Sequence, residues 1–228
     1  MNKSKCSTIL LTLCLFSAVA CQAEKKSKLI TNLESGKKQV VVAYGTSLTS
    51  HGAWVKQVGN TLNKKYPGLI TMHNYGGSGR WSDWGVKNLN AKVLKMNPDT
   101  VFIEFAINDC VDRFKASVKL AKSNLETIID RILKSNPDCE IILMVMNPAT
   151  GGWATYRSRL PKFYQMYRDV AKERGFLLID HYPDWKKILD KGLNKFKKYV
   201  PDGLHPGEKG CKTVTTPNII KALGIEAD

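Results

Sequence analysis

Short apolar runs recur along the chain, separated by stretches in which apolar residues lie three or four positions apart. A continuous apolar run of about four to eight residues is typical of a buried strand, and the longer spacing is typical of one buried helix face. Val101–Phe105 and Ile141–Val145 are apolar almost throughout, as expected for strands covered on both faces of a parallel sheet. The five predicted strands are Val40–Tyr44, Leu69–His73, Thr100–Phe105, Glu140–Val145 and Phe176–Asp180.

The segments between these runs carry the helical pattern. Trp54, Val58 and Leu62 are each four residues apart, which places them on one face of a helix. Strands that alternate with helices predict one α/β domain with a parallel sheet covered on both faces. Two further apolar stripes contain Leu120, Leu125, Ile128, Ile132 and Leu133, and then Tyr164, Tyr167, Val170 and Ala171.

Glycines and polar residues follow the predicted strands. In open parallel sheets, ligands bind in the crevice beyond the carboxyl ends of the strands. We therefore expect the chemistry of this protein in the residues that follow each strand. These are Gly45-Thr46-Ser47, Asn74–Gly79, Ala106–Asp109, Met146–Pro148 and Asp180-His181.

The first of these loops has two interpretations. Thr46 and Ser47 are residue types that cap the start of a helix. Alternatively, a hydroxyl group delivered by the strand is a nucleophile. A serine is a poor nucleophile at neutral pH unless a base takes its proton, and that base needs a third group to orient it.

Three of the four histidines are weak candidates for the base. His51 lies four residues after Ser47 and has no neighbouring carboxylate. His73 falls inside a predicted strand. His181 directly follows Asp180, and adjacent side chains diverge, so His181 is kept only as a candidate substrate contact.

The fourth histidine, His205, has a suitable partner. In the segment "PDGLHPG", Asp202 precedes His205 by three residues. Gly203 allows a tight turn between them, and Pro206 restricts the backbone that follows. A carboxylate in this position can reach the imidazole Nδ1–H and stabilise the imidazolium. A solvent-facing turn with an incidental ion pair is the alternative for this segment taken alone.

Four separated segments together resemble the SGNH, or GDSL-type, hydrolases, a flavodoxin-like α/β family of esterases and acyl hydrolases. The segments are "YGTSLT", "NYGGSG", "AIND" and "DGLHP", which occur in the family's order across residues 45 to 206. The resemblance implies a three-layer α/β/α fold and a catalytic triad of Ser47, Asp202 and His205. It also implies an oxyanion hole formed by the backbone N–H groups of Ser47 and Gly76 and by the Asn108 side chain. It implies no metal or organic cofactor.

The chain departs from the family pattern at two positions. Thr46 stands where the first segment usually has Asp, and Ala106 stands where the third usually has Gly. Neither change removes a reacting group. We expect different hydrogen bonds around the nucleophile turn and a tighter backbone near Asn108.

Aromatic residues near these segments bear on the substrate. Trp81 and Trp153 follow the second and fourth strands and are candidate substrate-binding residues, because exposed rings beside a polar crevice suit sugar rings, whereas Trp84 is expected to pack between helices. Arg80 and Arg157 are either contacts for an anionic substrate or solvated surface residues.

Because no long apolar lid is present, the chain most resembles a carbohydrate O-acetylesterase that acts on a small ester or acetylated carbohydrate. The alternatives are a lysophospholipase or thioesterase-like acyl hydrolase and a non-catalytic glycan-binding lipoprotein.

The first residues have the pattern of an export signal. Lys3 and Lys5 precede the apolar run Thr8–Ala20, which ends in small residues. Cys21 follows directly, as in bacterial lipoproteins, where such a cysteine carries lipid and attaches the protein to the membrane. We therefore expect a periplasmic or cell-envelope protein, either lipid-anchored at Cys21 or secreted. The predicted parts are a signal (1–21), a polar tether (22–38) and the hydrolase domain (39–225).

Charge and cysteine content bear on the kind of binding partner and on the presence of disulfides. The formal net charge of +15 favours anionic partners. No nucleic-acid-binding motif is present, so an anionic polysaccharide or a membrane surface is favoured over nucleic acid, with a lysine-rich solubilising surface as the alternative. Cys110, Cys139 and Cys211 have no metal-ligand spacing. Three buried thiols are favoured over one disulfide and a free thiol.

Overall fold

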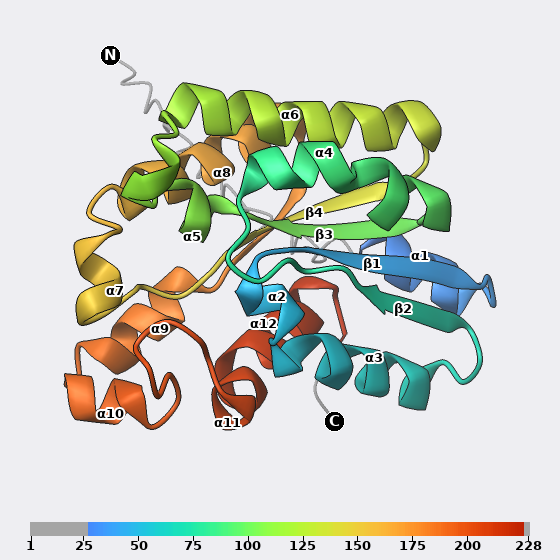
Figure 1. The fold of residues 1–228 in the computed structure, drawn as a ribbon. Helices are drawn as coiled ribbons and strands as arrows, with labels where there is room; N and C mark the ends of the chain where they lie inside the picture. Colours follow the sequence, from blue (N-terminus) through green and yellow to red (C-terminus); the bar gives the residue numbers. More distant parts are fainter. Residues whose placement is uncertain (1–26, 226–228) are drawn as a thin grey trace, which may run out of the picture.

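The computed structural model describes residues 27–225, which fold around a five-stranded parallel sheet (Figure 1). The strand order β2-β1-β3-β4-β5 is the flavodoxin-like order. Every predicted strand is present, and each predicted boundary is within one residue of the observed one, which confirms the expected fold class. The strands are β1 (Gln39–Gly45), β2 (Ile70–Asn74), β3 (Thr100–Glu104), β4 (Glu140–Val145) and β5 (Leu177–Asp180).

Helices cover both faces of the sheet (Figure 1). One face is covered by α4 (Ser82–Lys92), α6 (Val118–Ser135) and α8 (Leu160–Arg174), and the other by α1 (Lys28–Glu34), α3 (Ala53–Lys65) and α12 (Thr216–Ala222). Within residues 27–225, no helix combines the length and the apolar character needed to cross a membrane. The remaining helices are α2 (Ser47–Ser50), α5 (Ala106–Asp109), α7 (Gly152–Thr155), α9 (Tyr182–Leu189), α10 (Leu193–Lys197), α11 (Glu208–Gly210), η1 (Leu94–Met96), η2 (Asp112–Phe114) and η3 (Cys211–Thr215).

The predicted helix stripes form most of the core between these layers. Trp54, Val58 and Leu62 are buried on α3. On α6 the stripe is narrower than predicted, because Leu120 is 43% exposed. Leu120 is five residues from the buried Leu125, which is about 140° around a helix. It therefore lies away from the buried face.

The predicted polar tether is wrong for the residues that the structure describes. Ser27 caps α1 by accepting a hydrogen bond from the Ile30 N–H at 3.2 Å, and α1 buries Leu29, Ile30 and Leu33. The carboxylate of Glu140 on β4 accepts hydrogen bonds from the first two N–H groups of α1, at 2.8 and 2.9 Å. The domain therefore includes α1. The rest of the predicted tether and the predicted signal with Cys21 lie outside the described residues.

The three cysteines of the domain are buried free thiols, which confirms the favoured prediction. Cys110, Cys139 and Cys211 form no disulfide with one another. Burial raises the pKa of Cys110 and of Cys139 to about 12, so both remain protonated at neutral pH.

Candidate active site

Ser47 lies where β1 delivers the chain to the crevice at the carboxyl end of the sheet. β1 ends at Gly45, Thr46 caps α2 by accepting a hydrogen bond from the Leu48 N–H at 3.2 Å, and Ser47 is the first residue of α2. The helix-cap interpretation of this loop is therefore confirmed for one residue, and the nucleophile interpretation stays a prediction. Thr46 is the helix cap, and the Ser47 hydroxyl is free to contact groups across the crevice.

A continuous chain of hydrogen bonds joins Ser47, His205 and Asp202. The Ser47 Oγ lies 2.9 Å from His205 Nε2, and His205 Nδ1 lies 2.6 Å from Asp202 Oδ2. The other carboxylate oxygen of Asp202 accepts hydrogen bonds from the backbone N–H groups of Leu204 and His205 at 2.9 and 2.8 Å. The structure thus brings together the three residues that the sequence resemblance singled out.

The electrostatics of this turn favour an ionised Asp202. Burial acts to raise the pKa of Asp202, but hydrogen bonds from the side chain and backbone of His205 and from the backbone of Leu204 outweigh it. The pKa of Asp202 therefore lies below its ordinary value. An ionised carboxylate at Nδ1 stabilises the charged imidazolium that forms when Nε2 accepts a proton.

Glu104, at the end of β3, accepts hydrogen bonds from the turn that carries Ser47. This contact was not predicted from the sequence. The Glu104 carboxylate is 2% exposed and accepts hydrogen bonds from the Thr46 N–H at 2.6 Å, the Thr46 hydroxyl at 3.0 Å and the Thr49 hydroxyl at 2.7 Å. A side chain at Gly45 would collide with this carboxylate. Thr46 therefore supplies a hydrogen-bond donor that an ionised Asp at this position could not supply. A single Glu at the end of an apolar run was the available signal.

The protonation of Glu104 predicts a pH-dependent stability. Burial raises the pKa of Glu104 from 4.5 to about 7, and the hydrogen bonds from Thr49 and Thr46 act in the opposite direction. Because the folded pKa is above the unfolded one, the stabilisation from the bound proton is complete below pH 4.5 and is lost as the pH rises to about 7. One pKa unit corresponds to about 1.4 kcal/mol, so the loss is about 3 kcal/mol.

Glu104→Gln removes this titration, and urea unfolding from pH 4 to 8 measures the effect. We expect the unfolding free energy of the wild type to fall relative to that of Glu104→Gln over this interval. Two other buried groups, Asp109 with a pKa raised to about 7 and His181 with a pKa lowered to about 3, are common to both proteins and largely cancel in the difference. Parallel stability curves for the two proteins would contradict the assignment of the titration to Glu104.

Asn108 has one side-chain N–H without an acceptor among the described residues. It lies on α5, directly after β3, and is 4% exposed. Its Nδ2 donates to the Arg80 carbonyl at 2.7 Å, and its Oδ1 accepts from Arg157 Nη2 at 3.0 Å. An amide nitrogen has two hydrogen atoms. With Oδ1 held by Arg157, the second Nδ2 hydrogen remains available to a ligand.

Two glycines of the second segment, Gly76 and Gly79, differ in whether the backbone N–H has an acceptor. The Gly76 N–H donates to the Asn74 side chain at 3.1 Å, and a side chain on Gly76 would collide with the backbone of Ser50. The Gly79 N–H has no acceptor among residues 27–225. Gly79 immediately precedes Arg80, whose carbonyl binds Asn108. The structure therefore leaves Gly79 rather than Gly76 with a free donor, which the sequence reasoning missed although Gly79 ends the same segment.

Of the predicted aromatic contacts, Trp153 lies beside the hydrogen-bonded triad. Its ring is 39% exposed and meets the His205 ring edge-on, with 6.0 Å between the centroids. Trp81 is partly buried and stacks on Phe114 at 5.3 Å, next to Arg80 in the chain. Trp84 packs in the interior, but against the rings of Tyr44 on β1 and Phe105 after β3 rather than between helices as predicted.

His181, the third predicted substrate contact, does not reach the surface. Its side chain is fully buried, and neither ring nitrogen has a hydrogen-bond partner among the described residues. Its backbone N–H pairs with the Val145 carbonyl at 2.9 Å, which continues the β4–β5 pairing, and α9 begins at the next residue. Burial lowers the pKa of His181 to about 3, so the ring is neutral. The prediction that His181 contacts the substrate is therefore corrected.

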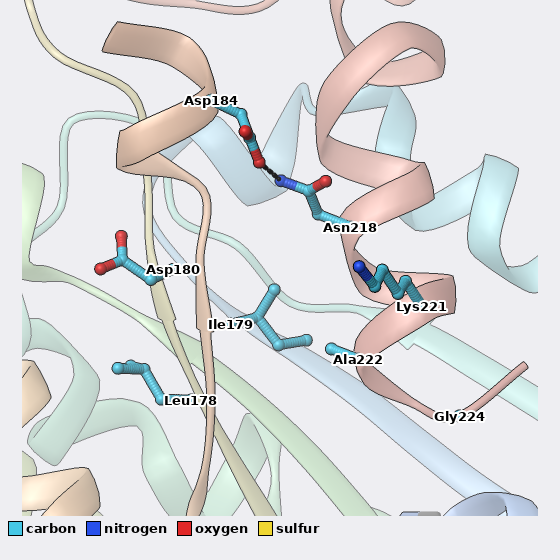
Figure 2. Close-up of a pocket in the computed structure, with 8 residues that line it drawn as sticks. All are labelled: Leu178, Ile179, Asp180, Asp184, Asn218, Lys221, Ala222 and Gly224. Carbon is cyan, nitrogen blue, oxygen red and sulfur yellow. Dashed lines mark hydrogen bonds between the residues drawn. The ribbon is translucent and has the colours of Figure 1, made fainter. Parts of the chain in front are cut away.

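A separate pocket of about 420 Å³ lies between β5 and α12 (Figure 2). Asp184 and Asn218 form a hydrogen bond of 2.9 Å at one end of it, and Lys221 lies nearby on α12. None of the predicted site residues lines this pocket. Residues 27–225 also contain no group of three or more His, Cys, Asp and Glu side chains arranged to hold a metal ion.

Comparison with known proteins gives a family match and several structural neighbours. The model of the GDSL-like Lipase/Acylhydrolase family matches residues 41–212. The search of curated proteins found no match. The structural neighbours are between 17% and 23% identical and share the fold.

Three of these neighbours illustrate the likeness. The lipase/acylhydrolase from Enterococcus faecalis has 23% identity and a TM-score of 0.69, over 80% of this chain and 94% of its own. A catalytic mutant of an acetylxylan esterase from Geobacillus stearothermophilus has 20% identity and a TM-score of 0.70, over 83% and 96%. An alpha/beta hydrolase from the metagenome of Lake Arreo, Spain, has 19% identity and a TM-score of 0.71, over 84% and 98%.

Proposed function

The chain belongs to the GDSL-like lipase/acylhydrolase family and is a carboxylic ester hydrolase, and we propose that it works through an acyl-enzyme on Ser47. The hydrogen-bonded chain from Ser47 through His205 to Asp202 is the observation that carries this proposal. A nucleophile, a base and an orienting carboxylate in this arrangement are the requirements for serine esterase chemistry.

The proposed reaction has two steps. In the first, Ser47 Oγ attacks the ester carbonyl while His205 Nε2 accepts its proton. His205 then gives that proton to the departing alcohol, and the acyl group stays on Ser47. In the second step, His205 deprotonates a water molecule that attacks the acyl-enzyme, which releases the carboxylic acid and restores Ser47. Asp202 stabilises the imidazolium in both steps.

Three donors are available for the negative charge that develops on the carbonyl oxygen. These are the Ser47 N–H at the start of α2, the second Nδ2 hydrogen of Asn108, and the Gly79 N–H. The first and third have no acceptor among the described residues, so neither has to break a protein hydrogen bond to bind the oxyanion. Removing one such donor typically costs about 3–4 kcal/mol of transition-state stabilisation.

We propose an acetyl group on a carbohydrate as the substrate. The exposed Trp153 ring beside His205 provides a stacking surface next to the reacting atoms, and the Trp81–Phe114 pair lies beside the loop that holds Asn108. Rings of this kind suit the apolar faces of sugars. An acetylxylan esterase is among the proteins of the same fold.

The acyl preference is tested with p-nitrophenyl esters of increasing chain length. We expect kcat/KM to be highest for acetate and to fall by about tenfold or more at octanoate and palmitate. Acetate release from a panel of acetylated polysaccharides then identifies the sugar. Trp153→Ala is expected to raise KM for the polymer without changing turnover of p-nitrophenyl acetate. A rate that increases with chain length would instead favour a lysophospholipase or thioesterase-like activity. If no ester is hydrolysed, a glycan-binding role becomes the better hypothesis.

A further inference from the structure

Arg157 is a buried cation next to the proposed oxyanion hole. It lies between α7 and α8 and is only 7% exposed. Charged side chains are rarely buried unless an opposite charge accompanies them. Among residues 27–225, no carboxylate forms an ion pair with Arg157, and its surroundings must satisfy the guanidinium in another way.

Three oxygen atoms and one ring surround the guanidinium. Its Nε donates to the Ile107 carbonyl at 2.9 Å, its Nη1 to the Trp153 carbonyl at 3.2 Å, and its Nη2 to Asn108 Oδ1 at 3.0 Å. Its Cζ lies 5.3 Å from the centre of the Trp153 ring. Two of the partners, Asn108 and Trp153, are residues that face the proposed reaction centre.

From this geometry we propose that Arg157 is a positioning residue that sets both the orientation and the donor strength of Asn108. The proposal rests on the proposed function. With Oδ1 held by the guanidinium, the amide must turn its Nδ2 toward the Arg80 carbonyl and the oxyanion position. The positive charge of the guanidinium next to Oδ1 also draws electron density from the amide, which makes the remaining Nδ2 hydrogen a stronger donor to developing negative charge.

Arg159 provides a matched control. It lies two residues further along the same segment and also donates to backbone carbonyls, those of Ala116 at 2.9 Å and Cys110 at 3.3 Å. Its guanidinium lies over the Phe163 ring at 5.4 Å. Arg159 therefore anchors the same part of the chain but makes no contact with Asn108. Arg159 also pairs with Asp112 at 3.5 Å, so Arg159→Met measures the cost of losing such an anchor together with that ion pair.

The test is a double-mutant cycle with p-nitrophenyl acetate. We expect Arg157→Met to lower kcat by roughly 10- to 100-fold, below the effect of about 10²–10³ for removing an oxyanion donor, with KM changed less than about threefold. Arg159→Met should keep kcat within about threefold. In the Asn108→Ala background, Arg157→Met should have almost no further effect, because residues that act as a unit are not additive. Thermal unfolding of all variants shows whether each one folds.

Arg157→Lys keeps the test decisive if Arg157→Met does not fold. Lysine keeps the charge but cannot satisfy three diverging acceptors. Because the charge is kept, Arg157→Lys should lower kcat less than Arg157→Met does. This decrease in kcat should again disappear in the Asn108→Ala background. The proposal would be overturned if the Arg157 variants lowered kcat by the same factor in the wild type and in the Asn108→Ala background. It would also be overturned if Arg157→Met and Arg159→Met had equal kcat. In both cases a large loss in Asn108→Ala would leave the proposed function intact. A wild type that neither hydrolyses esters nor reacts at Ser47 would overturn both.

Discussion

Ser47→Ala is expected to lower kcat for p-nitrophenyl acetate by roughly 10⁴- to 10⁶-fold, with little change in fold or substrate binding. The Ser47 hydroxyl is the only hydrogen-bond partner of His205 Nε2 among the described residues. Without it, no acyl-enzyme can form. The oxyanion donors remain, so a small residual rate above that in water is expected. A fluorophosphonate probe, which reacts covalently with activated serine hydroxyls, should label the wild type and not the variant.

Ser50→Ala is the matched control for this experiment. Ser50 is the last residue of the same short helix, and its hydroxyl forms no hydrogen bond with another described residue. We expect full labelling and a kcat within about twofold of the wild type. Persistent labelling of Ser47→Ala would mean that another residue is the nucleophile. Absence of labelling in the wild type as well would favour a binding protein on this fold.

Residue patterns predicted the strands and the Asp202–His205 pair because both depend on short stretches of chain. A strand buried on both faces is expected to be apolar at successive positions, and β3 and β4 have that pattern over residues 101–103 and 141–145. Asp202 and His205 are close in sequence, so a single turn brings them together. The choice among four histidines needed only the identity of the nearby residues.

Long-range contacts account for most of what the sequence did not predict. Glu104 and Thr46 are 58 residues apart, and Arg157 and Asn108 are 49 apart. No local pattern distinguishes a buried Arg with three oxygen partners from an exposed one. The unexpected Thr at position 46 is explained only by its hydrogen bond to the Glu104 carboxylate. The helix α1 was obscured by the lysines around its short apolar stripe.

The remaining differences between the predicted and the observed site result from local backbone geometry. The resemblance identified a whole segment for the second oxyanion donor but not which N–H in it is free. The Gly76 N–H donates to the Asn74 side chain. This contact between residues two positions apart depends on the turn formed after β2. For His181, the position at a strand end suggested an exposed ring. The immediate start of α9 turns the residue into the protein instead.

Asp202→Asn is expected to lower kcat by roughly 10³- to 10⁴-fold without disturbing the turn that holds His205. The asparagine Oδ1 can still accept the hydrogen bonds from the Leu204 and His205 N–H groups. Its Nδ2, however, replaces the oxygen that faces His205 Nδ1 and would donate a hydrogen bond to it. The ring proton then moves to Nε2, which can no longer accept the proton of Ser47. The loss should appear in kcat, with KM within about threefold of the wild type.

Asp180→Asn separates this effect from the general loss of a carboxylate. Asp180 has a similar set of contacts: its Oδ1 accepts from the Tyr182 N–H at 3.1 Å, and its Oδ2 accepts from Arg168 at 2.8 Å. It does not contact His205, so Asp180→Asn should keep kcat within about twofold. A kcat for Asp202→Asn within tenfold of the wild type would show that Asp202 does not set the tautomer of His205. The base would then have to be held by its contacts with Ser47 and Trp153 alone.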